Sequence, residues 1–343
     1  MKTMGIAEAL RTAIAEEMAR DERVFCIGED IGIPGGWGGA FTVTLGLEKL
    51  FPDRVLNTPI AELGLMGAAV GAALMGMRPI ADVQYGDFLF CAMDPVTSTA
   101  AKMRYMSGGT ASVPMVIRAP VGATGRGAQH AHNMERYFTG TPGLKVVAPS
   151  NAYDAKGILK AAVRDDDPVV IFEHKLLYGS KGPRAESGAV DATSAIPDED
   201  YVTPLDKAAV RREGRHVTIF AWLLMLHFAM QAAEELSREG IECEVVDVRC
   251  LSPLDLETMS TAAAKTGLAL VVEEGPKSCG VGAEIAAGLA ERAGNGLKAP
   301  PARLASPDVP PPFAPVLENA YRPDAKRIAD AARALAGRAL SGV

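Results

Sequence analysis

Thr58–Glu62 (TPIAE) is followed at Leu63–Met77 by the apolar run LGLMGAAVGAALMGM. Thr58 is a good helix N-cap and Pro59 suits the first helical position, so the pattern predicts a helix that begins here. No charged residue lies in the apolar run. The predicted helix is thus apolar apart from one acid, Glu62, in its first turn.

Glu62 has two interpretations. A carboxylate in a first turn complements the positive end of the helix dipole and needs no further role. A carboxylate among apolar residues, however, is costly unless it has a partner or a task. Taken alone, Glu62 favours the first interpretation, and only the rest of the sequence favours the second.

Length and composition predict a folded protein of two domains. The 343 residues exceed what one compact core usually holds. Hydrophobic residues make up 48% of the chain and charged residues 22%, which excludes a disordered protein. The net charge of −7 argues against nucleic acid or an anionic membrane as a partner. The N-terminal segment lacks the apolar core of a signal peptide, so we expect a cytoplasmic protein.

The domains are expected to meet at a linker. Residues 1–180 alternate short apolar runs with helical segments, which is typical of buried parallel strands joined by helices. Residues 181–204 lose this periodicity and are rich in Gly, Pro, Ser and acids, as in a linker. Residues 205–343 resume the alternation. We therefore predict an α/β protein with two doubly wound α/β domains.

The predicted strands of the first domain are Val24–Ile27, Val55–Leu56, Ile80–Gln84, Met115–Ala119, Lys145–Ala148 and Val169–Glu173. Those of the second are Val217–Trp222, Glu242–Asp247 and Ala269–Glu273. The five cysteines are scattered and never spaced as CxxC, so no cysteine metal site is expected. Cys26, Cys91 and Cys243 lie in apolar contexts, which predicts buried thiols in a reducing compartment.

An aromatic segment and a glycine-rich loop are candidate site elements. Tyr85–Phe88 (YGDF) follows a predicted core strand, where ligands of parallel sheets bind and where a planar side chain could stack on one. From position alone, Phe88 also fits an ordinary core. The loop Gly122–His132 (GATGRGAQHAH) lets the backbone approach a ligand and presents His130. The H-x-H spacing could bind metal, but a histidine that titrates beside a ligand is favoured.

Six segments that occur in a fixed order carry a family resemblance. They are IGEDIG (Ile27–Gly32), the segment Asn57–Gln84, AAKMRYMSGG (Ala100–Gly109), GAQH (Gly127–His130), the segment Pro142–Gly179 and LSPLD (Leu251–Asp255). With them, nearly the whole chain resembles the β subunit of the thiamine-diphosphate-dependent decarboxylating component of 2-oxo-acid dehydrogenase complexes. Pyruvate, branched-chain and acetoin dehydrogenases belong to this group.

The resemblance implies a thiamine pyrimidine-binding domain, a transketolase C-terminal-like domain and a role for several residues. The family's TPI-x-E glutamate, here Glu62, hydrogen-bonds N1′ of the aminopyrimidine and so promotes loss of the thiazolium C2 proton. Phe88 matches the aromatic that stacks on the pyrimidine, and Leu63 and Tyr85 are placed in the same cofactor site. His130 matches the histidine that serves substrate positioning, proton transfer or acyl transfer.

The segment RDDDP (Arg164–Pro168) has two interpretations. From the residues alone it is an acidic turn before a strand. The resemblance instead implies the potassium site of the pyruvate members. Its ligands would be Asp165 and Asp167 and the carbonyls of Met115 and Ala162.

The resemblance also implies partners. The family holds the diphosphate through Mg²⁺ bound by a GDG…NN motif, which this sequence lacks. An α subunit would supply that half of the site in an α2β2 heterotetramer, with thiamine diphosphate shared across the interface. The second domain would form the β–β contact and bind the subunit-binding domain of the lipoyl acyltransferase.

Two departures from the family pattern leave the substrate open. HAHN at His130–Asn133 stands where HSQS is usual, and bulky residues at Trp222–Met225 replace a glycine turn. The string EHKLLYGSKG (Glu173–Gly182) favours pyruvate- or acetoin-type members. Two other functions stay open: a stand-alone thiamine-dependent carboligase without lipoyl transfer, and a non-catalytic α/β assembly subunit.

Overall fold

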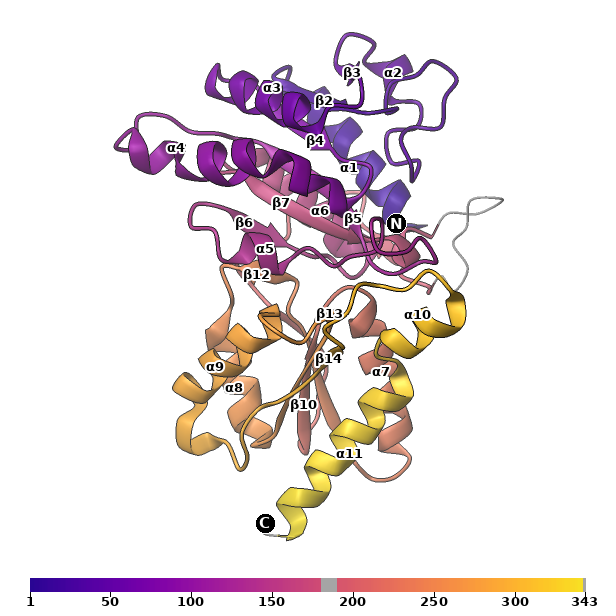
Figure 1. Cartoon of the computed structure of the whole chain (residues 1–343), viewed down its shortest axis with the longest axis vertical. Helices are drawn as coiled ribbons and strands as arrows, with labels where there is room; N and C mark the ends of the chain where they lie inside the picture. Colours follow the sequence, from indigo (N-terminus) through magenta and orange to yellow (C-terminus); the bar gives the residue numbers. More distant parts are fainter. Residues whose placement is uncertain (180–189, 342–343) are drawn as a thin grey trace.

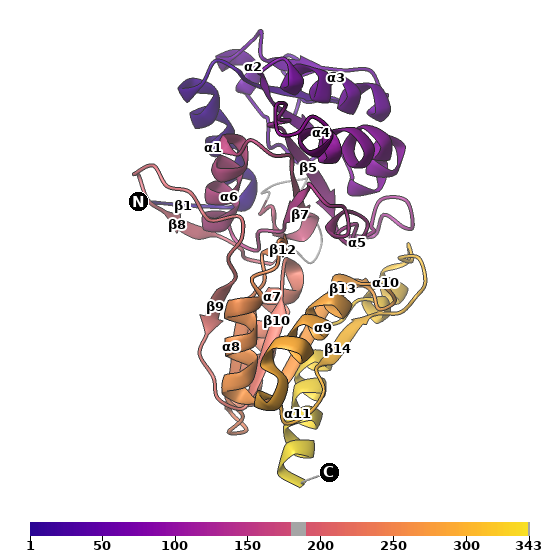
Figure 2. The same cartoon turned by 90° about the vertical axis from the view of Figure 1, so that its left-hand side faces the viewer.

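The computed structural model describes residues 1–179 and 190–341, which form two α/β lobes stacked end to end (Figure 1). A seven-stranded sheet lies at the centre of the first lobe and a five-stranded sheet at the centre of the second. The view turned by 90° shows helices on both sides of each sheet (Figure 2). The predicted α/β class is confirmed.

Six strands of the first sheet run parallel to one another, in the spatial order β6-β7-β5-β4-β2-β3. Their bounds are β2 (Val24–Gly28), β3 (Val55–Asn57), β4 (Arg78–Asp82), β5 (Val116–Val121), β6 (Lys145–Val147) and β7 (Val169–His174). Every residue of β2, β5 and β7 is buried. Helices cover both faces of such a sheet, which is why its strands are continuous apolar runs.

Helices and short helical turns pack on this sheet. They are α1 (Ile6–Arg20), α2 (Leu47–Leu50), α3 (Glu62–Leu74), α4 (Ala101–Met106), α5 (Arg136–Thr139), α6 (Ala152–Arg164), the 3₁₀ helices Gly86–Ala92 and Lys175–Leu177, and the π-helical segment Asp94–Ala100. Helix α3 packs against β4, against Gly86–Ala92 and against Asp94–Ala100. Helix α3 and the segment that carries Phe88 therefore lie side by side.

The helix predicted to begin at Thr58 begins at Glu62. The backbone N–H of Thr58 donates to the carbonyl oxygen of Gly28 at 2.9 Å, so Thr58 continues the extended chain of β3 and caps nothing. Ala61 takes the N-cap position without a side-chain hydrogen bond. A tertiary hydrogen bond thus overrides the local capping signal, and Glu62 becomes the first helical residue.

One face of α3 is buried by this chain and the other is not. Leu65, Met66, Ala69, Val70 and Ala73 face the core. On the opposite side Leu63 is 57% exposed and Met75 is 85% exposed, and Ile60 just before the helix is 83% exposed. We call Ile60, Leu63 and Met75 the open face of α3.

The second sheet has four parallel strands in the order β14-β13-β10-β11, with β9 antiparallel at the edge. The strands are β9 (Ala209–Arg212), β10 (Val217–Ala221), β11 (Cys243–Asp247), β13 (Ala269–Pro276) and β14 (Ala302–Ser306). The helices are α7 (Leu224–Ser237), α8 (Leu256–Thr266), α9 (Val281–Ala293), the 3₁₀ turn Gly294–Gly296, α10 (Pro315–Tyr321) and α11 (Ala325–Ser341). Among the described helices, none combines the length and apolar character that a membrane crossing requires.

Two short strands tie distant parts of the chain together. Strand β12 (Cys250–Ser252) comes from the second half of the chain but pairs with β6 at the edge of the first sheet. Strand β8 (Ser194–Ile196) pairs antiparallel with β1 (Lys2–Met4) at the N-terminus. Of the predicted linker 181–204, residues 181–189 lie outside the described part of the chain, and residues 194–196 form β8.

Candidate active site

Two carboxylates meet where β2 ends and α3 begins. Glu29 follows β2 directly and is buried, and Glu62 is half-buried at the first position of α3. Burial raises the pKa of Glu29, and the negative charge of Glu62 raises it further, while a hydrogen bond from the backbone N–H of Ala61 opposes the shift. Oε1 of Glu29 has no hydrogen-bond partner among the described residues. This corner therefore holds a carboxylate oxygen that is available to a ligand.

The sequence analysis missed Glu29 as a site residue. Its signal was present, because an acid that directly follows a buried parallel strand lies at the ligand-binding edge of the sheet. What could not be seen is its proximity to Glu62, since the pairing of β2 with β3 brings the two residues together.

Three rings from two segments of the chain pack against one another, and the side chain of Gln84, one residue before Tyr85, donates to the carbonyl oxygen of Glu29 at 3.5 Å. The ring centroids of Tyr85 and Phe88 are 5.5 Å apart, those of Tyr85 and His130 are 4.9 Å apart, and those of Phe88 and His130 are 5.4 Å apart. All three contacts are edge-to-face, with interplanar angles of 70°, 90° and 77°. Phe88 and His130 are both half-buried. The structure thus brings together the two predicted site residues, and Phe88 is not a fully buried core residue.

Lys175 contacts two members of this aromatic group, Tyr85 and His130. Its ammonium lies 5.2 Å from the centroid of the Tyr85 ring and donates a hydrogen bond to the carbonyl oxygen of His130. The guanidinium of Arg126 also lies over the Tyr85 ring, at 5.8 Å. Cations on the ring face hold Tyr85 in place, and Tyr85 in turn contacts both Phe88 and His130.

The two histidines of the H-x-H sequence have different surroundings. His130 joins the aromatic group, whereas Nδ1 of His132 lies 2.6 Å from Oδ1 of the buried Asp87. Within residues 1–179 and 190–341, no group of three or more His, Cys, Asp or Glu side chains could hold a metal ion. His132 is therefore paired with a carboxylate.

Leu63 lies on the open face of α3, one residue after Glu62. Its side chain makes little contact with this chain and remains accessible to a cofactor or a partner. The predicted cofactor residues thus fall into two classes, with Phe88 and Tyr85 packed in an aromatic group and Leu63 exposed beside it.

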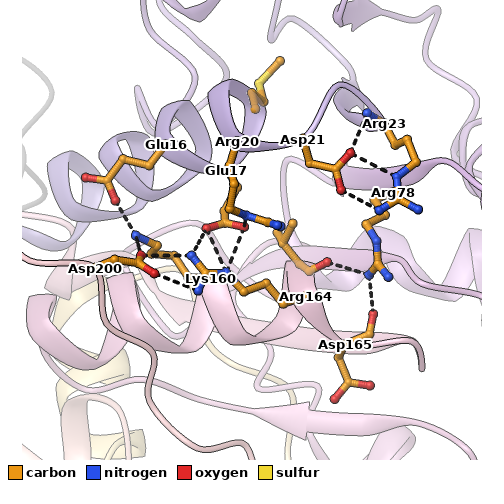
Figure 3. Close-up of polar contacts among 12 residues, drawn as sticks. Glu16, Glu17, Arg20, Asp21, Arg23, Arg78, Lys160, Arg164, Asp165 and Asp200 are labelled. Carbon is orange, nitrogen blue, oxygen red and sulfur yellow. Dashed lines mark hydrogen bonds and ion pairs between the residues drawn. The ribbon is translucent and has the colours of Figure 1, made fainter.

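The residues predicted to bind potassium are engaged with other groups. Each of the three consecutive aspartates pairs with its own cation: Asp165 with Lys145 at 2.6 Å, Asp166 with Arg78 at 2.5 Å, and Asp167 with Arg104 at 2.5 Å. The carbonyl oxygen of Met115 accepts the N–H of Val169, and that of Ala162 accepts the N–H of Asp165. Figure 3 shows Arg78 reaching the backbone of Asp165, with the ion pairs that join α1 to α6 beside it.

Potassium needs several oxygen ligands that are free of other strong partners. In the present arrangement Lys145 and Arg104 neutralise the side chains of Asp165 and Asp167, and potassium binding here stays a prediction. Residues 165–168 form the connection between α6 and β7, which agrees with the interpretation of RDDDP as an acidic turn before a strand.

The corner at Glu62 does fit the pyrimidine half of thiamine diphosphate. It offers a half-buried carboxylate for a ring nitrogen, rings that can contact a planar heterocycle, and an unpartnered oxygen on Glu29. A diphosphate needs a different set of groups, such as hard oxygen ligands around Mg²⁺.

Comparison with known proteins agrees with this geometry. Residues 2–181 match the family "Transketolase, pyrimidine binding domain", and residues 206–328 match "Transketolase, C-terminal domain". A solved split-gene transketolase, described as an inactive β4 tetramer, shares the fold with a TM-score of 0.77 and 24% identity, over 97% of this chain and 98% of that one.

Three curated relatives carry the names of different enzymes. The β subunit of 2-oxoisovalerate dehydrogenase from Bacillus subtilis is 45% identical, over 98% of this chain and 99% of the relative. The β subunit of acetoin:2,6-dichlorophenolindophenol oxidoreductase from Cupriavidus necator is 44% identical, over 97% of each chain. The mitochondrial β-1 subunit of the rice pyruvate dehydrogenase E1 component is 42% identical, over 99% of this chain and 88% of the relative. This chain therefore belongs to the transketolase-like family of β subunits of thiamine-diphosphate-dependent 2-oxo-acid and acetoin dehydrogenases.

Proposed function

We propose that this chain is the β subunit of a thiamine-diphosphate-dependent enzyme that decarboxylates a 2-oxo acid or cleaves acetoin. The acyl group would then pass to the lipoyl group of an acyltransferase. The observation that carries the proposal is the placement of Glu62 at the start of α3, close to Glu29 with its unpartnered oxygen, on a helix that packs against the segment Gly86–Ala92, which carries Phe88. The three relatives carry the names of enzymes with different substrates, and their identities to this chain, 45%, 44% and 42%, are too similar to select one substrate.

The residues of this chain would bind and orient the pyrimidine and move protons around it. The carboxyl group of Glu62 would hold a proton at the ring nitrogen N1′, while Phe88 contacts the ring face. Thiamine diphosphate, when bound, supplies a carbon nucleophile for the carbonyl group of the substrate. His130, held in the aromatic group, would position the substrate or transfer a proton at its oxygen.

The charge of Glu29 matters for the same step. Burial raises the pKa of Glu29, and the negative charge of Glu62 raises it further, because two negative charges so close together repel each other. We propose that burial beside Glu62 favours the protonated form of the Glu29 carboxyl in this corner.

The open face of α3 supports an α partner. Ile60 and Leu63 are exposed apolar residues on either side of Glu62, Met75 is exposed at the far end of the helix, and contiguous exposed apolar surface marks sites where proteins associate. We propose an α2β2 heterotetramer in which the α subunit holds Mg²⁺ and the diphosphate. The second lobe would form the β–β contact and bind the acyltransferase. The five free cysteines support a reducing compartment such as the cytoplasm.

Reconstitution tests the function. The chain is mixed with its α partner, thiamine diphosphate and Mg²⁺, and reduction of an artificial electron acceptor is measured with pyruvate, acetoin and branched-chain 2-oxo acids. We expect turnover with one of these classes, and loss of turnover when either the α subunit or the cofactor is left out. No turnover with any of the substrates would overturn the proposal.

A further inference from the structure

The loop that carries His130 is held by residues of the second lobe. Residues 122–130 leave the end of β5, and the second-lobe groups that bind their backbone belong to β13, α10 and the residue after α10. We propose that Glu274, Glu318 and Arg322 are positioning residues that set where His130 stands in the active site. This inference rests on the proposed function for the role of His130, but not for the ordering of the loop.

Glu274 binds both the loop and a histidine that packs on the loop. Its Oε1 accepts the backbone N–H of Ala123 at 2.8 Å, and its Oε2 lies 2.8 Å from Nε2 of His174. Nδ1 of His174 accepts the N–H of Leu176 at 3.1 Å, so we assign the ring proton to Nε2, which donates to Glu274. Glu274 and His174 are both buried. Each oxygen of this carboxylate therefore has a donor in the first lobe.

Two further groups from the second lobe hold the next residues of the loop. Oε1 of Glu318 accepts the backbone N–H of Gly125 at 2.6 Å, and Nη1 of Arg322 donates to the carbonyl oxygen of Ala123 at 2.9 Å. Glu318 is buried as well. The N–H and the carbonyl of Ala123 are thus both bound by side chains that lie about 150 to 200 residues further along the chain.

The same contacts lead on to His130. Gly122 has a φ of +95°, and a Cβ atom there would lie 2.0 Å from Nε2 of His174, so the imidazole packs directly on the loop backbone. The next residue after His174, Lys175, donates to the carbonyl oxygen of His130. The two ends of residues 122–130 are therefore held by adjacent residues, one of which is fixed by Glu274.

Positioning predicts a particular kinetic effect. A displacement of about 1 Å in a reacting group can lower a rate by about 100-fold, whereas a group that only stabilises the fold changes the melting temperature. Loss of Glu274 or Glu318 should therefore lower kcat with little change in the KM for thiamine diphosphate, because the contacts with the cofactor lie on α3 and the segment 85–88.

Three variants separate the hydrogen bonds from the charge. The carbonyl oxygen in E318Q can still accept from Gly125, whereas E318A removes the acceptor. In E274Q the amide has only one acceptor for two donors, so one of the two bonds must break. E244Q is the matched control, because Glu244 is also a buried carboxylate of the second lobe, on β11, but pairs with Lys265 away from the loop.

The variants are tested first by hydrogen–deuterium exchange of the full chain, which requires no cofactor. We expect faster exchange in residues 122–130 in E274Q and E318A, with β5 unchanged, and wild-type exchange in E318Q and E244Q. The reconstituted enzyme should then show a fall in kcat of roughly tenfold or more in E274Q and E318A. E318Q and E244Q should stay within about twofold of wild type.

Each result decides the inference. Wild-type exchange of the loop in both E274Q and E318A would overturn it. Faster exchange with an unchanged kcat would also overturn it, because the loop would then be held without consequence for His130. If the wild-type enzyme itself shows no turnover, the proposed function fails, and the exchange data alone decide whether the second lobe orders the loop.

Discussion

The corner at Glu29 and Glu62 and the turn at Asp165–Asp167 are both acidic, but their surroundings are opposite. Each aspartate of the turn has a cation within 2.6 Å, from β6, β4 or α4. The corner has no such compensation for Glu29, whose Oε1 lacks a partner in the described part of the chain and whose pKa is raised. The difference teaches that a buried acid is a candidate for ligand binding when the protein leaves it unpaired.

The largest expected effect separates the two regions by activity. In the reconstituted enzyme, E62Q should lower kcat by about 100-fold or more, because an amide cannot exchange a proton with a ring nitrogen. D165N should change kcat by less than about threefold, because it alters only an ion pair at a turn. E48Q is the control, since Glu48 also lies in the first turn of a helix, α2. Equal losses in E62Q and D165N would contradict the comparison.

The next prediction concerns pH and stability. The pKa of Glu29 is higher in the folded protein than in the unfolded chain, so the folded state holds a proton that the unfolded state releases. Its contribution to the free energy of unfolding is present below the ordinary pKa near 4.5 and is lost as the pH rises through the raised value. E29Q should therefore gain stability over wild type as the pH increases, by about 1 kcal/mol.

Denaturant unfolding of wild type and E29Q at pH 5 and pH 8 measures this difference. E48Q again serves as the control, and its difference from wild type should not change between the two pH values. If the free energy of unfolding of E29Q differs from that of wild type by the same amount at both pH values, the pKa of Glu29 is not raised by folding, and the contrast with the aspartate turn fails.

The smallest effect concerns potassium. Since Lys145 and Arg104 already neutralise Asp165 and Asp167, replacing Na⁺ by K⁺ at equal ionic strength should leave the melting temperature within about 1 °C. K145A frees the carboxylate of Asp165 and should make any response to K⁺ larger. A clear rise in the wild-type melting temperature with K⁺ would show that the turn rearranges to bind the ion.

The core of the fold could be predicted because its strands are buried on both faces. β2, β5 and β7 lie within two residues of their predicted bounds, since a strand without a solvent face is a continuous apolar run. The start of α3 could not be predicted, because the backbone N–H of Thr58 donates to the carbonyl oxygen of Gly28, at the end of the neighbouring strand β2. A capping signal is local, whereas that hydrogen bond depends on the completed sheet.

The candidate site was predicted only in part for a related reason. Glu62, Phe88 and His130 stand in motifs that can be recognised along the chain. Lys175 and Glu274 make their contacts across the fold, and no local pattern distinguishes them from other buried polar residues. Glu29 directly follows a buried strand, but its proximity to Glu62 depends on the pairing of β2 with β3. Residues that support the site from other parts of the fold were therefore harder to predict than the residues in its motifs.

Strand β12 has a consequence for how the chain must be produced and assembled. Cys250 and Ser252 pair with Val147 and Val146, and the N–H of Ala148 donates to the carbonyl oxygen of Arg249 at 2.7 Å. A fragment that ends at the predicted linker would leave β6 as a bare sheet edge, open to pairing with other chains. During synthesis the edge of β6 therefore stays unpaired until residues 249–252 have left the ribosome, so the order of the chain sets when the first sheet can be completed.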